Sequence, residues 1–261
     1  MRDSNSFLWR GQAHLDRETF LVPVRWKNNW PVAGIHKKCL LQMEGPLWNK
    51  QSNPVKYSMD FAGTGMEPQW LYRRKPVSEN YVRKDGSLTL YAAEVKLQDA
   101  IGSPTLIALR QPDRVFQMEA DCRIITCNEG DIAGMTVYLS ENFFCRMGKT
   151  KKNGCDYLIV EAKLEELDVE LYCRQLQSDI GQLQLKITSD GLYYYFYYTI
   201  PENAEILAAK LSVRFLSCEL AGKCFTGALV GCFAECGNFI KTHAEDMVRA
   251  CMKISEVRIY E

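Results

Sequence analysis

The sequence predicts an all-β sandwich or barrel from about residue 57 to the C-terminus. Apolar and polar side chains alternate over short segments that are rich in β-branched and aromatic residues. Turn-forming pairs such as Asp85-Gly86 and Asn153-Gly154 separate these segments. Helical periodicity is hard to find, and no repeat indicates a solenoid. From these observations we expect two β-sheets packed face to face.

The predicted strands follow one another at short intervals along the chain. They cover residues 87–91, 115–122, 133–139, 157–162, 183–189, 193–198, 228–234 and 254–260. Residues 161–171 carry charges at helical spacing, but they fit two strands with a turn at Glu165-Glu166 equally well. Residues 244–251 fit either a short helical turn or a loop. Because alternate side chains of a strand point inward, we expect a core that includes Trp70, Leu88, Phe116, Val137, Leu185 and Phe233.

The N-terminal part of the chain differs in character from the rest. Residues 1–38 are rich in Trp and Arg and include a strand-like piece at 19–26. Residues 39–56 contain glycine, proline and asparagine and are typical of a linker. We therefore divide the chain into an N-terminal segment, 1–38, a linker, 39–56, and a β-sandwich, 57–261.

The composition argues against several classes of partner. Lys+Arg and Asp+Glu both number 32 in the 261 residues, so the formal net charge is zero, which argues against nucleic acid. No apolar run approaches the roughly 20 residues that span a bilayer, so we expect no membrane partner. Residues 1–6 are polar and lead into no signal-peptide core, and we expect a cytoplasmic protein.

Cysteine and histidine give no sign of a metal site. The chain has 11 cysteines, and none forms a CxxC pair. An odd count without an export signal predicts reduced thiols and no disulfides. Cys232 and Cys236 lie four residues apart, and His14, His36 and His243 are far apart, so neither group has the spacing of metal ligands. We expect no metal and no cofactor.

No motif in the sequence marks a catalytic residue. The densest acidic cluster, Glu165, Glu166 and Asp168, fits a solvated turn. A glycosidase needs two carboxylates on opposite sides of a bond, and no local motif singles out such a pair. Aromatic residues suit sugar binding, because pyranose rings stack on them while polar groups bond the hydroxyls. Candidates are Trp70, Tyr72, Arg73, Arg74 and the aromatic run 193–198, about half of which must face the core.

Several segments carry a family resemblance. Residues 14–26 read HLDRETFLVPVRW and are followed by NWPV at 29–32, and residues 221–234 read AGKCFTGALVGCFA. These segments resemble glycoside hydrolase family 43 β-xylosidases, in which the first segment leaves the catalytic domain. Asp16 stands where the family usually has Gly. Short matches at 68–70, 87–90 and 109–111 extend the resemblance over nearly the whole chain.

The resemblance implies an architecture and a site. It implies a concanavalin-like two-sheet β-sandwich (jelly roll) at 57–261, after a remnant of the catalytic-domain end. In the family a five-bladed propeller supplies the catalytic carboxylates, and the sandwich lends an aromatic side chain to the mouth of the propeller's pocket. The chain would then have no catalytic residue of its own, and Phe225, beside Thr226, would lie at that mouth. Cys224 stands where the family often has a second aromatic, and residues 254–257 replace an acidic-aromatic pattern, so no metal site is expected there.

Three functional hypotheses follow. The first is a non-catalytic accessory module that completes a separate propeller chain or binds a xylo- or arabino-oligosaccharide, using Phe225, Thr226, Trp70 and Arg73. The second is a stand-alone sandwich enzyme, a polysaccharide lyase or glucanase, with paired carboxylates or a Tyr/Arg/His set on the concave sheet. The third is a truncated gene product without activity. An exposed flank that normally meets a propeller would favour a homodimer.

Overall fold

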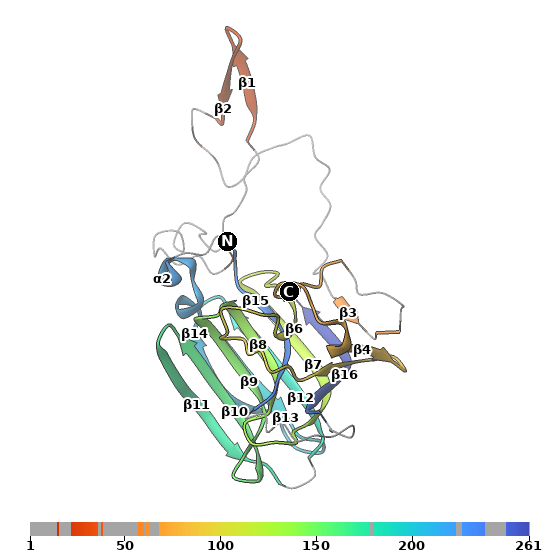
Figure 1. Cartoon of the computed structure of the whole chain (residues 1–261). Helices are drawn as coiled ribbons and strands as arrows, with labels where there is room; N and C mark the ends of the chain where they lie inside the picture. Colours follow the sequence, from red (N-terminus) through yellow and green to blue (C-terminus); the bar gives the residue numbers. More distant parts are fainter. Residues whose placement is uncertain are drawn as a thin grey trace.

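Two antiparallel β-sheets packed face to face form the body of the protein, as Figure 1 shows for the computed structural model. The structure describes residues 15, 22–35, 38, 57–59, 61–62, 68–177, 180–222, 226–237 and 249–260. The smaller sheet has six strands, in the spatial order β11 (Leu167–Gln175), β10 (Cys155–Leu164), β9 (Phe143–Lys152), β8 (Ile132–Ser140), β15 (Leu229–Glu235) and β6 (Thr105–Arg110).

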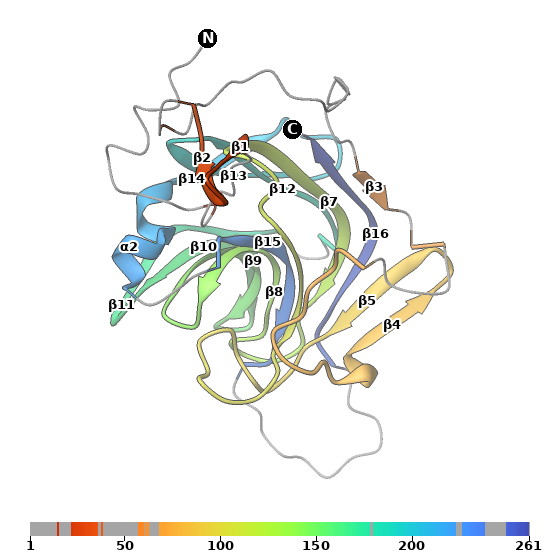
Figure 2. The same ribbon diagram turned by 90° about the horizontal axis from the view of Figure 1, so that it is seen from above.

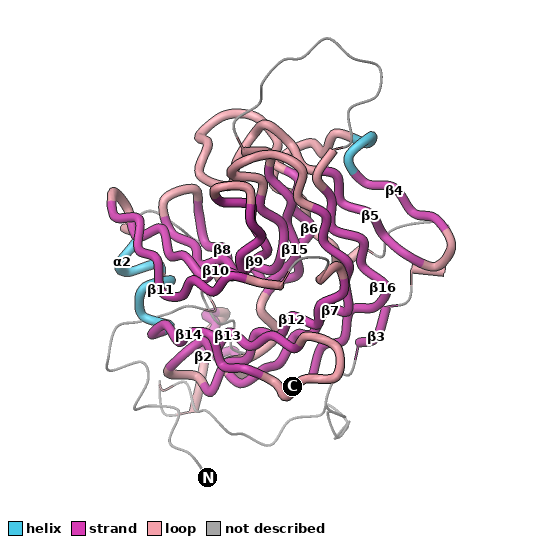
Figure 3. The backbone as a smooth tube through the Cα atoms, turned by 90° about the horizontal axis from the view of Figure 1, so that it is seen from below, coloured by secondary structure: helices cyan, strands magenta, loops and turns pink. Residues whose placement is uncertain are grey.

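The larger sheet has eight strands and bends round the smaller one (Figure 2). Its order is β14 (Ile206–Ser212), β13 (Tyr193–Thr199), β12 (Gln182–Asp190), β7 (Val115–Ile125), β16 (Cys251–Tyr260), β5 (Ser87–Tyr91) and β4 (Tyr81–Lys84). β3 (Tyr57–Met59) pairs with β16 beside this path. Figure 3 shows the two layers of strands and the small helical content.

Helix occupies three short segments of the described residues, η1 (Ser78–Asn80), η2 (Val213–Leu216) and α2 (Cys218–Ala221). None of the helices in this part of the chain is long and apolar enough to cross a membrane. The sequence predicts a helical turn or a loop at 244–251, of which residues 244–248 lie outside the described residues. Residues 249–250 are in neither a helix nor a strand, and β16 begins at Cys251.

The alternating sequence pattern is the reason that these segments form strands. In β12 and β13 every second side chain enters the space between the sheets, where Leu185, Tyr194 and Phe196 have no exposed surface. All six residues predicted for the core are buried, and Trp70, at 6% exposed, is the most accessible of them. The predicted all-β, two-sheet sandwich is therefore confirmed.

The charged segment 161–171 is a hairpin, as one of its two interpretations predicted. β10 and β11 pair directly from Leu164 and Leu167, and Glu165 adopts a positive φ of 60° in the turn. The charges that resembled a helical pattern lie on the outer face and on the edge strand, because β11 is exposed along most of its length. Helical spacing here is a by-product of two strands with polar outer faces.

A second apolar cluster covers the outer face of the six-stranded sheet. Leu97, from the segment 92–104 that joins β5 to β6, packs there against Phe144 and Phe233. Arg73 holds this segment, because its guanidinium donates hydrogen bonds to the Leu97 carbonyl at 2.8 Å and the Asp99 carbonyl at 2.6 Å. Phe233 is therefore buried, as predicted, but outside the space between the sheets. The centre of this sheet consequently has no solvent-exposed face, and in β8 eight consecutive residues are buried.

A separate hairpin lies near the N-terminus and stands away from the sheets in Figure 1. It consists of β1 (Val24–Lys27) and β2 (Trp30–Ala33). The turn residues Asn28 and Asn29 have φ of 51° and 59°, which is the positive-φ pair of a type I′ hairpin turn. Trp26 and Trp30 are 72% and 73% exposed. The strand predicted at 19–26 thus overlaps β1, while residues 16–21 and the predicted linker 39–56 lie outside the described residues.

The nine described cysteines are free thiols. Several of them act as small apolar side chains of the core, where burial raises the pKa of the Cys232 thiol to about 12 and raises that of Cys145 further. Cys39 and Cys224 lie outside the described residues.

A buried lysine of the six-stranded sheet contacts the backbone that leads into the eight-stranded sheet. Lys149 of β9 is 5% exposed, and its ammonium lies 2.7 Å from the Asp156 carboxylate of β10. The same ammonium donates to the backbone carbonyl of Ile180, 3.0 Å away, just before β12 in the other sheet. Partial burial raises the pKa of Asp156, but hydrogen bonds from Lys149 and Thr126 outweigh it and leave this pKa below its ordinary value. Asp156 therefore stabilises the fold in its ionised form.

We predict that this contribution disappears in acid. Because the folded-state pKa of Asp156 is lowered, its contribution is complete above the unfolded-state value of about 3.9 and is lost as the pH falls through the folded value. Asp156→Asn should lower the free energy of unfolding by about 2 kcal/mol near neutral pH, since the Lys149 ammonium loses its partner. Urea unfolding of both proteins at several pH values should show the difference shrinking below about pH 4. A difference that stays constant with pH would contradict this role.

Candidate functional site

The outer face of β9 and β10 carries a group of charged side chains that pair with one another. Phe143, Cys145 and Met147 point into the core, so Phe144 and Arg146 must point outward. The register places Arg146 directly opposite Glu161 of β10. Sequence and pairing together therefore put a cation and an anion side by side on this face.

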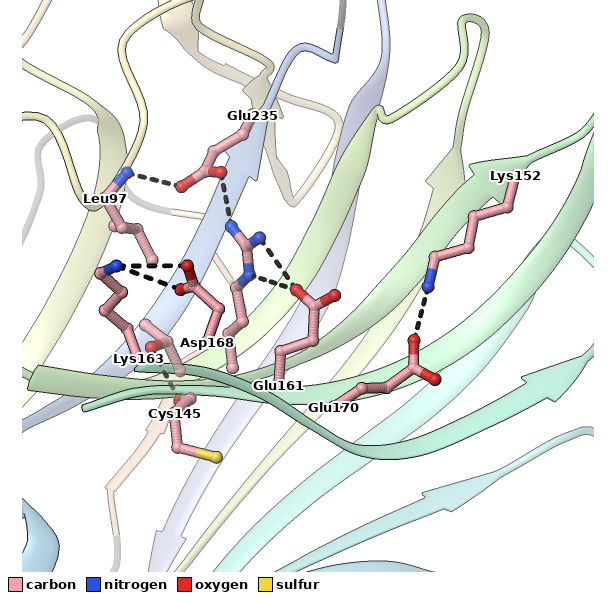
Figure 4. A network of polar contacts seen from close by, with 10 residues as sticks. Leu97, Cys145, Lys152, Glu161, Lys163, Asp168, Glu170 and Glu235 are labelled. Carbon is pink, nitrogen blue, oxygen red and sulfur yellow. Dashed lines mark hydrogen bonds and ion pairs between the residues drawn. The ribbon is translucent and has the colours of Figure 1, made fainter. Parts of the chain in front are cut away.

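Arg146 lies at the centre of a charged network, and Figure 4 labels its two carboxylate partners, Glu161 and Glu235. Its Nη1 donates to Oε2 of Glu235 at 2.6 Å, and its Nε and Nη2 donate to Oε2 of Glu161 at 3.1 and 2.9 Å. Glu235 is 1% exposed and also accepts the Leu97 backbone N–H at 2.6 Å. The guanidinium carbon lies 5.9 Å from the centre of the Phe233 ring. Burial lowers the pKa of Arg146, but Glu235 and Glu161 raise it above its ordinary value, so the side chain stays cationic.

Two further ion pairs continue the network toward the sheet edge. Lys163 lies 3.2 Å from Asp168, and Lys152 lies 2.6 Å from Glu170. Each of the four carboxylates drawn in Figure 4 thus has a basic partner. The carboxylates and their basic partners therefore give this face both acceptors and donors for hydrogen bonds to hydroxyl groups.

Two hollows lie on either side of Arg146 and Glu161. One, of about 270 Å³, reaches over Phe144 to Asp168 and Glu170, and the other, of about 450 Å³, reaches along β9 to Asn153. Because the hollows share Arg146 and Glu161, they form one shallow groove, which we name the β9–β10 groove. Within the described part of the chain, Oε1 of Glu161 accepts no hydrogen bond, so it is available to a ligand in this groove.

The structure places the residues predicted to bind sugar in different environments. Trp70 is in the core, where its indole N–H donates to the Met59 sulfur at 2.8 Å. Arg73 has 10% of its side chain exposed and is engaged with carbonyl groups of segment 92–104. The two lie on opposite sides of the sheet edge, where Leu71 between them bridges to Ala108 of β6. A sugar contact by either residue stays a prediction.

Thr226 is exposed and lies just before β15. Its carbonyl accepts a hydrogen bond from the Cys218 thiol at 3.5 Å, which links it to α2. Phe225 lies outside the described residues. The role of both at a pocket mouth stays a prediction.

The sequence did not reveal the β9–β10 groove, because its residues come from distant parts of the chain. Arg146, Glu161 and Glu235 meet only through the register of β9, β10 and β15. Among the described residues no group of three or more His, Cys, Asp or Glu could hold a metal ion, and the three histidines lie outside them.

The family model and the similar proteins point to the same family. Residues 58–245 match the model of the β-xylosidase C-terminal concanavalin A-like domain. A non-reducing end α-L-arabinofuranosidase, BoGH43B of Bacteroides ovatus, is 27% identical over an alignment of 241 positions, which covers 89% of this chain and 44% of that protein. This chain therefore spans less than half the length of that curated relative.

Solved structures support the same fold. The structure described as Bacteroides ovatus xyloglucan PUL GH43B has a TM-score of 0.79 and 24% identity, with 95% of this chain and 48% of that chain covered. The GH43 BlXynB protein of Bacillus licheniformis has a TM-score of 0.78 and 20% identity, with the same coverage. At these identities the likeness establishes the fold alone.

We predict that Arg146 is required for stability. Arg146→Met removes the cation and leaves the Glu235 carboxylate buried without it, which should cost about 3–5 kcal/mol of the free energy of unfolding. Glu161→Gln leaves the Glu235 pair intact and should cost only about 1 kcal/mol. Lys152→Met, at an exposed pair, is the matched control and should cost less than about 1 kcal/mol. Urea unfolding followed by circular dichroism measures all three, and an Arg146→Met protein as stable as the wild type would exclude this role.

Proposed function

The chain belongs to the family of β-xylosidase C-terminal concanavalin A-like domains, and from this membership we propose that it is the accessory module of a glycoside hydrolase family 43 β-xylosidase or α-arabinofuranosidase. One observation carries the proposal: nearly all of this chain aligns with less than half of a longer arabinofuranosidase. In this proposal a propeller domain performs the hydrolysis, and its substrate is a xylo- or arabino-oligosaccharide.

The N-terminal hairpin supports a contact with such a propeller. The pairs Val24–Ala33 and Trp26–Pro31 lie directly opposite each other, so all four side chains share one face. This face is entirely apolar, and its residues are exposed. A two-stranded hairpin is marginally stable in water by itself, and a bare apolar surface favours association. We infer that this face packs against the propeller, on the same or a separate chain, and that a second copy of this chain covers it in a homodimer when no propeller is present.

The segment before β15 is the proposed contribution to the active-site mouth. Thr226 is exposed, and the adjacent Phe225 would present an aromatic ring to a sugar at the rim of the propeller's pocket. Trp70 and Arg73 are candidates for a further contact with the same ligand. The nine free thiols fit a reducing compartment such as the cytoplasm, where we propose that the protein works.

We predict that the purified chain alone does not hydrolyse aryl β-xyloside or aryl α-arabinofuranoside. Mixed with a separately expressed family 43 propeller domain, it should raise the kcat/KM of that domain, because the sandwich completes the pocket. Phe225→Ala should lower kcat/KM of the pair by about tenfold, since one stacking contact is lost. Leu167→Ala is the matched control, because this residue is 65% exposed at the remote β10–β11 turn, and it should change nothing.

Two results would contradict the proposal. One is a pair whose kcat/KM equals that of the propeller alone. The other is turnover by the chain alone that Glu161→Gln abolishes, which would favour the stand-alone sandwich enzyme. Sedimentation of the chain with and without the propeller shows whether the homodimer gives way to a mixed complex.

A further inference from the structure

The outer face of the eight-stranded sheet carries a row of tyrosines that the proposed function does not use. Alternate residues of β13 fill the core, so Tyr193, Tyr195 and Tyr197 point away from it. Their ring centres follow one another at 6.3 and 6.4 Å along the strand. Tyr193 is 38% exposed, and the other two are partly exposed. The row therefore forms an accessible aromatic wall.

The strand register places a polar floor beside this wall. Tyr195 pairs with Thr188 of β12, Thr188 pairs with Gln117 of β7, and Gln117 pairs with Tyr260 of β16. Neighbouring strands are about 4.8 Å apart, so a second tyrosine stands roughly 14 Å from the first, across short or flexible polar side chains. A hollow of about 440 Å³ lies over this floor, with Tyr197 of the row and Tyr260 of β16 in its lining, and we name it the β13–β16 trough. Its lining includes Gln117, Lys186, Thr188, Tyr197, Glu205 and Tyr260.

The groups that line the trough include both hydrogen-bond donors and hydrogen-bond acceptors. The ammonium of Lys186 lies 4.6 Å from the Tyr197 ring centre and pairs with the Glu205 carboxylate, so the site contains both charges without an excess of either. Gln117 donates its amide N–H to Glu119 at 2.8 Å, which holds the amide in place. The Thr188 hydroxyl can donate and accept. The trough thus combines aromatic walls with donors and acceptors on its floor.

This combination favours a neutral carbohydrate over other ligands. A nucleic acid needs an excess of basic groups, and a stable protein interface usually has a desolvated core depleted of charged residues. Sugar rings have apolar C–H faces that pack on tyrosine and hydroxyl groups that pair with amides, hydroxyls and charged groups. An open trough, in contrast to a closed pocket, admits the middle of a chain as well as its end.

We propose that the β13–β16 trough binds a chain of neutral sugar residues, at a surface separate from the active-site mouth. The choice of a pentose chain of the xylan or arabinan class rests on the proposed function. Such a site holds the enzyme on a polymer while the propeller removes residues from the chain ends.

Titration calorimetry of the purified chain with xylohexaose and with arabinohexaose tests the proposal. We expect one of these sugars to bind. Tyr197→Ala should weaken binding roughly tenfold by removing one aromatic wall, and Tyr197→Phe should retain most of it. Val82→Ala is the matched control, because Val82 lies on β4 at the far edge of the same sheet face and is 39% exposed, and it should bind as the wild type does. Thermal unfolding of each variant verifies that the fold is intact.

The proposal is overturned if neither sugar binds at millimolar concentration, or if Tyr197→Ala and Tyr260→Ala both bind as tightly as the wild type. Its failure can be told apart from failure of the proposed function. Hydrolysis of a small aryl xyloside by the mixture with a propeller does not involve the trough, so Tyr197→Ala should leave that rate unchanged. A protein that fails to bind the oligosaccharide but still stimulates the propeller would refute this inference alone.

Discussion

The buried pairing of Arg146 with Glu235 is the interaction on which the outer face of the six-stranded sheet depends. Glu235 accepts from Arg146 with one oxygen and from the Leu97 backbone with the other, so a single carboxylate ties β9, β15 and segment 92–104 together. A buried ion pair seldom adds net stability over an apolar substitute, because removing two charges from water is costly. Its value here is geometric: the segment is held over the aromatic cluster, and the β9–β10 groove is left open beside it.

The division of the sheets into covered and open surfaces follows from this arrangement. Segment 92–104 covers one half of the outer face, where Arg73 also holds it. The other half becomes more polar and more accessible toward the edge strand β11. On the opposite side of the sandwich, the row of outward tyrosines gives the larger sheet a surface of a different chemistry. The same framework thus offers a charged groove on one side and an aromatic trough on the other.

Sequence reasoning recovered the parts of the fold that depend on local pattern. The alternation in β12 and β13 predicted both the strands and the inward residues, and the turn at Glu165-Glu166 was one of two stated alternatives. The groove was beyond its reach, because strand register decides which distant side chains meet. The register shifts between Val160 and Glu161 in the β10–β11 pair, and between Ile254 and Glu256 in the β16–β7 pair. No local sequence pattern predicts such a shift. The hairpin turn at Asn28 and Asn29 was also missed, although a pair of asparagines is suited to positive φ.

The continuous burial of β8 has a consequence for the evolution of this protein. In most strands of the sandwich, one of the two alternating sets of side chains faces water and can vary with little effect on folding. β8 has no such set, because one set packs in the core and the other packs in the cluster beneath segment 92–104. Polar substitutions are therefore costly at nearly every position of the strand. Among diverging relatives that keep this segment, β8 and the similarly buried β6 and β15 should be the slowest strands to change, and their residues should vary mainly by exchange among apolar side chains of similar volume.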